Sequence, residues 1–175
     1  VWEWDKEASP NSVGAAYFCM AWKYLNSYAR KKEARFVRQD YSHELMAKFL
    51  YKAEKYFQRR FGKRDVTLGE LQRHVRGDRD EPVGGLPDVI SAMYSTKWKK
   101  GRYQSFLGDT YIQLIRFKDG ELFMETVEPF GQSYHEDSPH FDDQMEMYLQ
   151  GKTKPMSLDK AKVLKVKERE YHPGE

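Results

Sequence analysis

Residues 131–144 read GQSYHEDSPHFDDQ, a polar stretch that predicts a tight loop leading into a helix. Ser138 and Pro139 are residue types preferred at the N-cap and at the first position of a helix. The aspartates that follow would lie in the first turn, where the helix dipole stabilises carboxylates. Gly151 stands where a helix over about 139–150 would end.

This stretch resembles the C-terminal signature of the penicillin acylase family. Three other stretches resemble family motifs, and all four appear in family order: VWEWDKEASPNSVGAAYFCMA at 1–21, TLGELQRHVRGDRDEPVGGLPDVI at 67–90 and GDTY at 108–111. The resemblance extends over nearly the whole chain. One position departs from the family pattern, because Tyr134 stands where the family usually has glycine. If that position requires a positive φ, a tyrosine there would be strained.

The resemblance implies that the chain is the C-terminal part of the β chain of an N-terminal-nucleophile hydrolase. Its fold class would be α+β, a portion of an αββα sandwich with a helical lead, an antiparallel hairpin, a final helix and a closing strand. Its implied partners are the remaining α and β segments of the acylase and a small-molecule N-acyl substrate. The implied location is periplasmic or secreted. Because the chain starts at Val1 rather than at methionine, we expect it to be trimmed from a longer chain.

The catalytic residue of such an enzyme is the Ser, Thr or Cys that begins a mature chain, and its own α-amine acts as the base. Here the first residue is Val1, and none of the 12 glycines precedes Ser, Thr or Cys, which is the usual pattern at a processing site. We therefore expect no catalytic residue in this chain and an attacking group that lies outside it. By itself the chain should be inactive and should supply scaffold.

Composition limits the other functions. The chain has 175 residues, the size of one domain, with 30 Lys and Arg against 27 Asp and Glu, a net charge of +3. This balance does not favour a nucleic-acid partner. No apolar run approaches the roughly 20 residues that cross a bilayer, so we expect no membrane contact. Nothing in the sequence indicates a cofactor.

The first part of the chain, residues 1–75, is predicted to be helical. Apolar residues at helical spacing indicate one helix from near Ser12 and a second over about 42–61 that ends at Gly62. Thr67-Leu68-Gly69-Glu70 forms a capping box, which predicts a short third helix to about Val75. Residues 76–108 are rich in Gly, Pro and Asp in their first part and are interpreted as a loop-rich connection.

The last part, residues 109–175, is predicted to contain a hairpin with strands at 111–117 and 121–127 around an Asp-Gly turn. Beyond the signature helix, residues 163–170 alternate between apolar and charged, which favours a closing strand but also fits a frayed helix. As a detached piece of a sandwich, the hairpin should have an open edge and an exposed apolar face.

Several residues could carry chemistry of their own. His135 and His140, with four nearby carboxylates, could hold a metal, but their spacing lacks an HExxH register and the acidic residues also suit a structural loop. The structural loop is favoured, so no metal site is predicted. Thr110, Ser133 and Ser138 are not in a Gly-x-Ser-x-Gly elbow. Cys19 is the single cysteine of the sequence, which excludes an internal disulfide. It lies on an apolar helix and is interpreted as a buried, inert thiol.

The remaining motifs have two interpretations each. Asp109 could orient an active-site histidine through a hydrogen bond, as the resemblance implies for some family members, or could cap the start of a strand. Residues 76–78, Arg-Gly-Asp, favour a turn over an adhesion motif, and residues 82–85 lack a phosphate-loop pattern. Basic residues near aromatic ones favour solvated helix faces. They also leave open an alternative function, a non-catalytic module that binds protein or nucleic acid.

Overall fold

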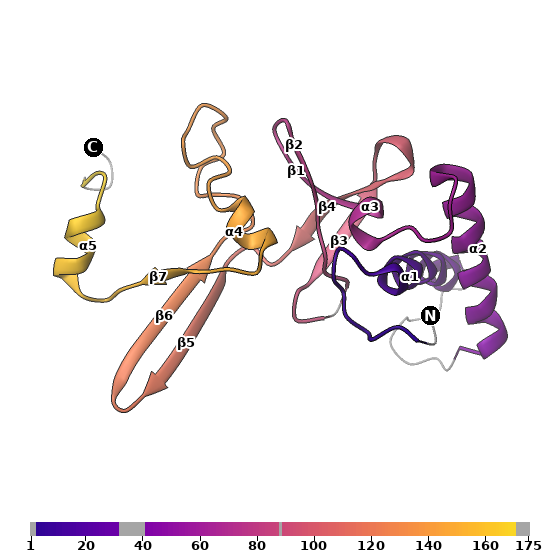
Figure 1. Cartoon of the computed structure of the whole chain (residues 1–175), viewed down its shortest axis with the longest axis horizontal. Helices are drawn as coiled ribbons and strands as arrows, with labels where there is room; N and C mark the ends of the chain where they lie inside the picture. Colours follow the sequence, from indigo (N-terminus) through magenta and orange to yellow (C-terminus); the bar gives the residue numbers. More distant parts are fainter. Residues whose placement is uncertain (1–2, 32–40, 88, 171–175) are drawn as a thin grey trace. The chain divides into compact units, whose positions relative to one another are not determined.

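The computed structural model describes residues 3–31, 41–87 and 89–170. The chain divides into two compact units, Val1–Asp109 and Thr110–Glu175, and each is described by itself (Figure 1). In the part of the chain that is described, no helix has the length and apolar character needed to cross a membrane.

Two long helices begin the first unit. Helix α1 (Val13–Lys31) starts where the Ser12 hydroxyl accepts the Ala15 N–H at 3.1 Å. Helix α2 (His43–Phe61) has Ser42 as its N-cap and ends at Gly62, which adopts the left-handed conformation at φ 73°. Both helices were predicted, and their positions are confirmed. Their caps are local sequence signals that neighbouring structure does not override.

The core of the first unit lies between α1, α2 and the sheet. Small residues on both helices allow close approach, and Met20 and Phe57 fill the space between them with no exposed surface. Tyr17 meets Phe57 edge to face at a centroid distance of 5.0 Å. Trp4 closes one side of α1 at Gly14, where an added Cβ would lie 2.2 Å from Trp4 Cγ. Only glycine fits at this position, because a larger residue would displace the indole.

The third helix is shorter than predicted. In α3 (Leu68–Leu71), the Thr67 hydroxyl accepts the Glu70 N–H and the Glu70 carboxylate accepts the Thr67 N–H, which confirms the capping box. The helix ends at Leu71, and strand β1 (Gln72–Arg76) follows at once, so the prediction of helix to Val75 and of a wholly helical region 1–75 is wrong. Strand pairing on both sides of β1 overrides the helical pattern.

Residues 76–108 form most of a sheet, which corrects the prediction of a loop-rich connection. Strands β2 (Arg79–Pro82), β3 (Met93–Lys97) and β4 (Tyr103–Gly108) join β1 in the order β2-β1-β4-β3, with the short 3-10 helix η2 (Lys99–Gly101) before β4. β1 pairs antiparallel with β2 and parallel with β4. The strands were missed because their buried positions are largely polar and their pairing is long-range.

The second unit is built on a hairpin. Strands β5 (Ile112–Lys118) and β6 (Glu121–Val127) pair in full register around Asp119 and Gly120, whose φ values are 53° and 79°. Positive φ at both turn residues is the geometry that suits the twist of paired strands, and the predicted hairpin is confirmed. Strand β7 (Lys154–Met156) pairs with β6, which leaves β5 at the edge of the three-stranded sheet.

The signature stretch forms turns for most of its length rather than a helix. Helix α4 (Met145–Leu149) covers only the end of the predicted range 139–150. The helix-start signal at Ser138 is used in a turn, where its hydroxyl accepts the His140 N–H at 3.2 Å. Tyr134 does not have a positive φ, so the strain considered for it does not arise.

Gly151 ends α4 as predicted. Its φ is 64°, its N–H donates to the Tyr148 carbonyl, and the Lys152 N–H donates to the Met147 carbonyl. These two bonds form a Schellman motif, which satisfies carbonyl groups at the end of a helix.

The closing strand predicted at 163–170 is also wrong. Helix α5 (Lys160–Val166) occupies most of that range, with Asp159 as its N-cap; the Asp159 carboxylate accepts the Ala161 N–H at 2.8 Å. The alternation of apolar and charged residues had favoured a strand, but the N-cap at Asp159 stabilises the start of a helix instead. The strand that does join the hairpin is β7, which lies earlier in the chain.

The burial of Phe57 allows the effect of a cavity on stability to be predicted. Replacing Phe57 with alanine should lower the free energy of unfolding by about 3–5 kcal/mol, because the emptied space cannot collapse fully. Urea unfolding followed by tryptophan fluorescence measures the loss. The control is Tyr51→Ala on the same helix, where the ring is 57% exposed and the loss should stay under about 1 kcal/mol. Equal losses would contradict the assigned core.

Candidate functional site

Strand β1 contains a group of buried polar side chains. Gln72 is 1% exposed. Its amide nitrogen donates to the carbonyl oxygens of Gly84 and Gly85, each at 3.1 Å, and its amide oxygen accepts from the Ser95 hydroxyl at 2.8 Å. Both ends of the amide are therefore paired, as burial of a polar group requires. Gln72 joins β1 to the 84–85 turn and to β3.

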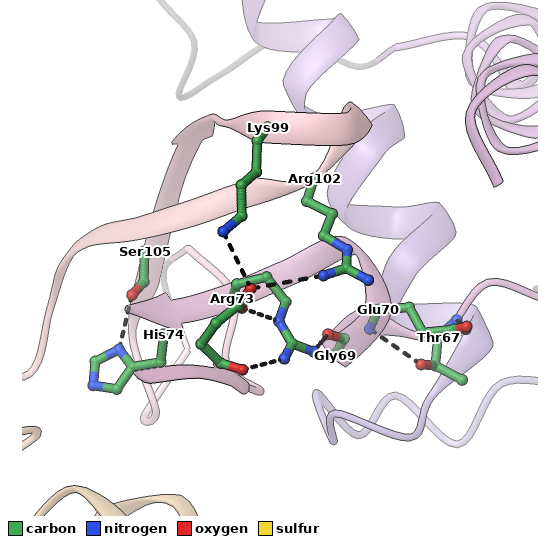
Figure 2. Close-up of polar contacts among 9 residues, drawn as sticks. Thr67, Gly69, Glu70, Arg73, His74, Lys99, Arg102 and Ser105 are labelled. Atoms are coloured by element: carbon green, nitrogen blue, oxygen red, sulfur yellow. Dashed lines mark hydrogen bonds and ion pairs between the residues drawn. The ribbon is translucent and has the colours of Figure 1, made fainter. Parts of the chain in front are cut away.

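His74 and Ser105 lie within hydrogen-bond distance on neighbouring strands. The His74 Nδ1 and Ser105 Oγ atoms are 2.8 Å apart, from β1 and β4 (Figure 2). A serine beside a histidine is the minimum arrangement for nucleophilic catalysis. These two side chains, however, are only 3% and 9% exposed. A substrate amide has no access to them, so the geometry indicates a link between strands.

A third interaction surrounds Asp80 on β2. The Arg73 Nε donates to the Asp80 carboxylate at 2.6 Å, and its guanidinium also donates to the Asp80 and Gly69 carbonyls (Figure 2). Lys99 and Arg102 approach the same carboxylate at 3.8 Å and 3.7 Å. One partly buried carboxylate thus holds three cations from β1 and from the 99–102 segment.

Sequence reasoning did not find this network. Its charged members come from segments interpreted as helix and loop, and the pairing of Arg73 with Asp80 depends on the hairpin between β1 and β2. Residues 77–78 form the two-residue turn of that hairpin, and Gly77 has a φ of 54°. A signal was present, since Arg73 and Asp80 lie on the two sides of a Gly-Asp turn. The favoured reading of residues 76–78 as a turn agrees with the structure.

Residues 82–85, which were tested against a phosphate-loop pattern, lie against the N-terminal segment. The Gly85 N–H donates to the Ala8 carbonyl at 2.8 Å, and an added Cβ at Gly84 would lie 2.5 Å from that oxygen. The two glycines therefore permit a close backbone contact. This packing role accounts for both of them.

Cys19 is buried in the core, as predicted, and burial raises the pKa of its thiol. A thiol held in its neutral form is a poor nucleophile. Asp109 follows β4 at the boundary between the two units. The role considered for it, orienting a histidine, remains a prediction.

The two histidines of the signature stretch do not converge on a common site. His135 stacks beside Tyr134, with ring centroids 4.1 Å apart. His140 donates or accepts at both ring nitrogens, to Asp143 at 2.9 Å and to Glu168 at 3.0 Å. Within the described ranges no three His, Cys, Asp or Glu side chains gather in a way that could hold a metal ion.

The hydroxyl groups of this stretch serve its turns. The Ser133 and Ser138 hydroxyls accept the N–H groups of His135 and His140, each at 3.2 Å. Gly131 lies against the His140 carbonyl, where an added Cβ would come within 2.2 Å. The Gly-Gln-Ser opening is therefore determined by the loop itself. Thr110 lies in the bend before β5 and is exposed.

A basic groove between α1, α2 and β3 was also missed. It encloses about 910 Å³, and Lys23 lies in its wall beside Ser95 and Tyr103. The Lys23 ammonium donates to the Ser95 carbonyl at 2.6 Å and lies 4.6 Å from the centre of the Tyr103 ring. Burial lowers the pKa of Lys23 and raises that of Tyr103. Lys23 was not among the basic residues noted in the sequence, whereas Lys31 and Lys97, which were, also line the groove and are exposed as expected.

One comparison with known proteins shows the family. The family model described as penicillin amidase matches residues 2–165. Among solved structures, the chain is similar to a thermostable penicillin G acylase from Alcaligenes faecalis, with 18% identity and a TM-score of 0.37. That match covers 87% of this chain and 28% of the acylase chain, so this chain spans less than a third of that relative. No curated protein matches the chain.

The network around Asp80 predicts unequal effects for neighbouring carboxylates. Asp80→Ala should lower the free energy of unfolding by about 1–3 kcal/mol, because it removes the carboxylate that neutralises Arg73 next to two other cations. Glu81→Ala removes a more exposed pair with Arg79 at 3.6 Å and should cost under about 1 kcal/mol. Urea denaturation at neutral pH compares the two. A larger loss for the Glu81 variant would contradict the network.

His140 predicts a pH dependence. Hydrogen bonds with Asp143 and Glu168 raise its pKa above the ordinary value. Because the folded pKa is raised, these bonds stabilise the fold below the unfolded pKa, and the gain is lost as pH rises through the folded value. NMR titration of the ring protons should give a pKa above about 6.5, and Asp143→Asn should lower it. An unchanged pKa in that variant would contradict the contact.

Proposed function

The chain belongs to the penicillin amidase family, and we propose that it forms the C-terminal part of an acylase β chain. The whole enzyme would hydrolyse an N-acyl amide bond with an apolar acyl group through an N-terminal nucleophile outside these residues. Membership rests on a match over nearly the full length. What these residues contribute follows from their own geometry.

The observation that carries the proposal is the hairpin, which exposes an apolar face. Its register pairs Ile115 with Met124 and Phe117 with Leu122 on that face. The other face is mixed, because Ile112 lies opposite Val127 while Leu114 and Phe123 lie opposite charged residues. Leu114 and Ile115 point to opposite faces, and they are 53% and 51% exposed. An apolar sheet face that is exposed in this way is typical of a surface that another layer covers.

An αββα sandwich would supply such cover. In that architecture each sheet packs on the second sheet through one face and on helices through the other. Phe117, at 81% exposure, and the free edge of β5 would then be closed by segments outside this chain. The expected partners are accordingly the remaining α and β segments of the same acylase.

The chemistry we propose for the whole enzyme needs no residue from this chain. A Ser, Thr or Cys at the start of a mature chain would attack the amide carbonyl, with its own α-amine as the base. Backbone N–H groups would stabilise the oxyanion. The serine–histidine pair found in this chain is buried and joins two strands. We therefore assign this chain a scaffold role, and we propose a periplasmic or secreted location for the enzyme.

The proposal predicts the composition of the native protein. Intact-mass analysis of material from its source should find companion chains, one of which begins with Ser, Thr or Cys. An electrophile such as phenylmethylsulfonyl fluoride should label that first residue and abolish hydrolysis of an N-acyl substrate. The control is Ser133→Ala in this chain, which should leave kcat/KM within about threefold, less than the tenfold that 1.4 kcal/mol of barrier represents.

Two outcomes would contradict the proposal. Amide hydrolysis by the isolated 175-residue chain would place the nucleophile within it. A native protein that consists of this chain alone, monomeric and without a companion, would instead favour a non-catalytic interaction module.

A further inference from the structure

The basic groove concentrates positive charge in a chain whose net charge is only +3. Of the described residues that line it, five are cations, and none carries a carboxylate: Lys23, Arg30, Lys31, Lys52 and Lys97. They come from α1, α2 and β3. A concave surface lined by one sign of charge attracts ligands of the opposite sign.

Lys23 is the one of these five cations that is partly buried rather than exposed. Its ammonium group contacts the Ser95 carbonyl and the face of the Tyr103 ring, neither of which carries a charge. Burial lowers its pKa, which shows that its charged form is held at a cost. A carboxylate that reached the ammonium group would offset this cost.

Lys52 is held in the same manner. Its ammonium lies 4.2 Å from the centre of the Tyr24 ring, and Tyr24 also lines the groove. An aromatic face positions a cation without neutralising it. Two ammonium groups are thus kept in place on aromatic rings and remain available to bind an anion.

The span of the groove indicates the shape of its ligand. Lys23 and Lys31 are eight residues apart on α1, a distance of about 12 Å along the helix axis. One phosphate or carboxylate cannot contact both. An extended polypeptide covers that length with about four residues. The groove also borders β3, which lies at the edge of its sheet and pairs only with β4 among the described strands.

We propose that this groove binds an extended acidic segment of polypeptide, with one carboxylate on Lys23 and others on Lys52 and the basic end of α1. The lysines provide charge, and the partly exposed ring of Tyr24 provides apolar surface for the stems of glutamate side chains. The proposal does not depend on the acylase function, because every group it uses lies in the first unit.

The test measures binding of a fluorescent peptide with about four consecutive glutamates to the full 175-residue chain by anisotropy. Binding should be saturable and should weaken as salt screens the charges. Lys52→Met should weaken it by about five- to tenfold. The matched control is Lys48→Met, an exposed lysine one turn earlier on α2 that does not line the groove, and its affinity should change by less than about twofold.

Lys23 is tested by two substitutions. Lys23→Met should reduce affinity by about tenfold, and Lys23→Arg, which keeps the charge, should retain most of it. If Lys23→Met fails to fold, the peptide affinities of the Lys52→Met and Lys48→Met variants still test the proposal.

Three results would overturn the proposal. The first is absence of saturable binding. The second is an equal loss in the Lys48 and Lys52 variants, which would indicate a general charge effect. The third is evidence for another kind of ligand. This would be equal binding of a peptide with glutamine in place of glutamate, or complete displacement of the peptide by inorganic phosphate at equal concentration.

Discussion

Strand β1 determines the first unit, because its buried side chains are polar and each one must find a partner. Gln72 is paired at both ends of its amide, and His74 contacts Ser105. A shift of β1 by one residue would turn these two side chains to the opposite face and remove them from these partners. The cost of burying an unpaired polar group, about 1–3 kcal/mol each, thus fixes the parallel register with β4.

Local signals allowed much of the helical and hairpin structure to be predicted. The caps at Ser42 and Gly62 give the bounds of α2, and Asp119 with Gly120 gives the turn of the β5–β6 hairpin. In each case a few neighbouring residues determine the backbone conformation. The family could also be recognised from motifs, and the family match over residues 2–165 confirms it.

The four-stranded sheet could not be predicted in the same way. Its strands lack the alternation of apolar and polar residues that marks a strand, since Gln72 and His74 occupy buried positions, and β1 pairs with residues 31 positions away. The network around Asp80 and the basic groove also depend on contacts between distant residues, so neither could be predicted from local patterns. Lys23 on an amphipathic helix has the pattern of a solvated residue, and only the fold shows that Ser95 and Tyr103 lie beside it. Conversely, the helix start at Ser138 was a real local signal that the chain uses in a turn.

The exposed apolar face of the hairpin has a consequence for how the chain folds. Its strands are joined by Asp119 and Gly120, so it can close within about 1–10 μs. Any layer that later covers it must arrive through contacts distant in sequence, which form more slowly. In the interval, Leu114 and Phe117 remain in water together with the unpaired edge of β5. If segments outside this chain cover the hairpin as proposed, the time before they dock sets how long this apolar surface is exposed to aggregation.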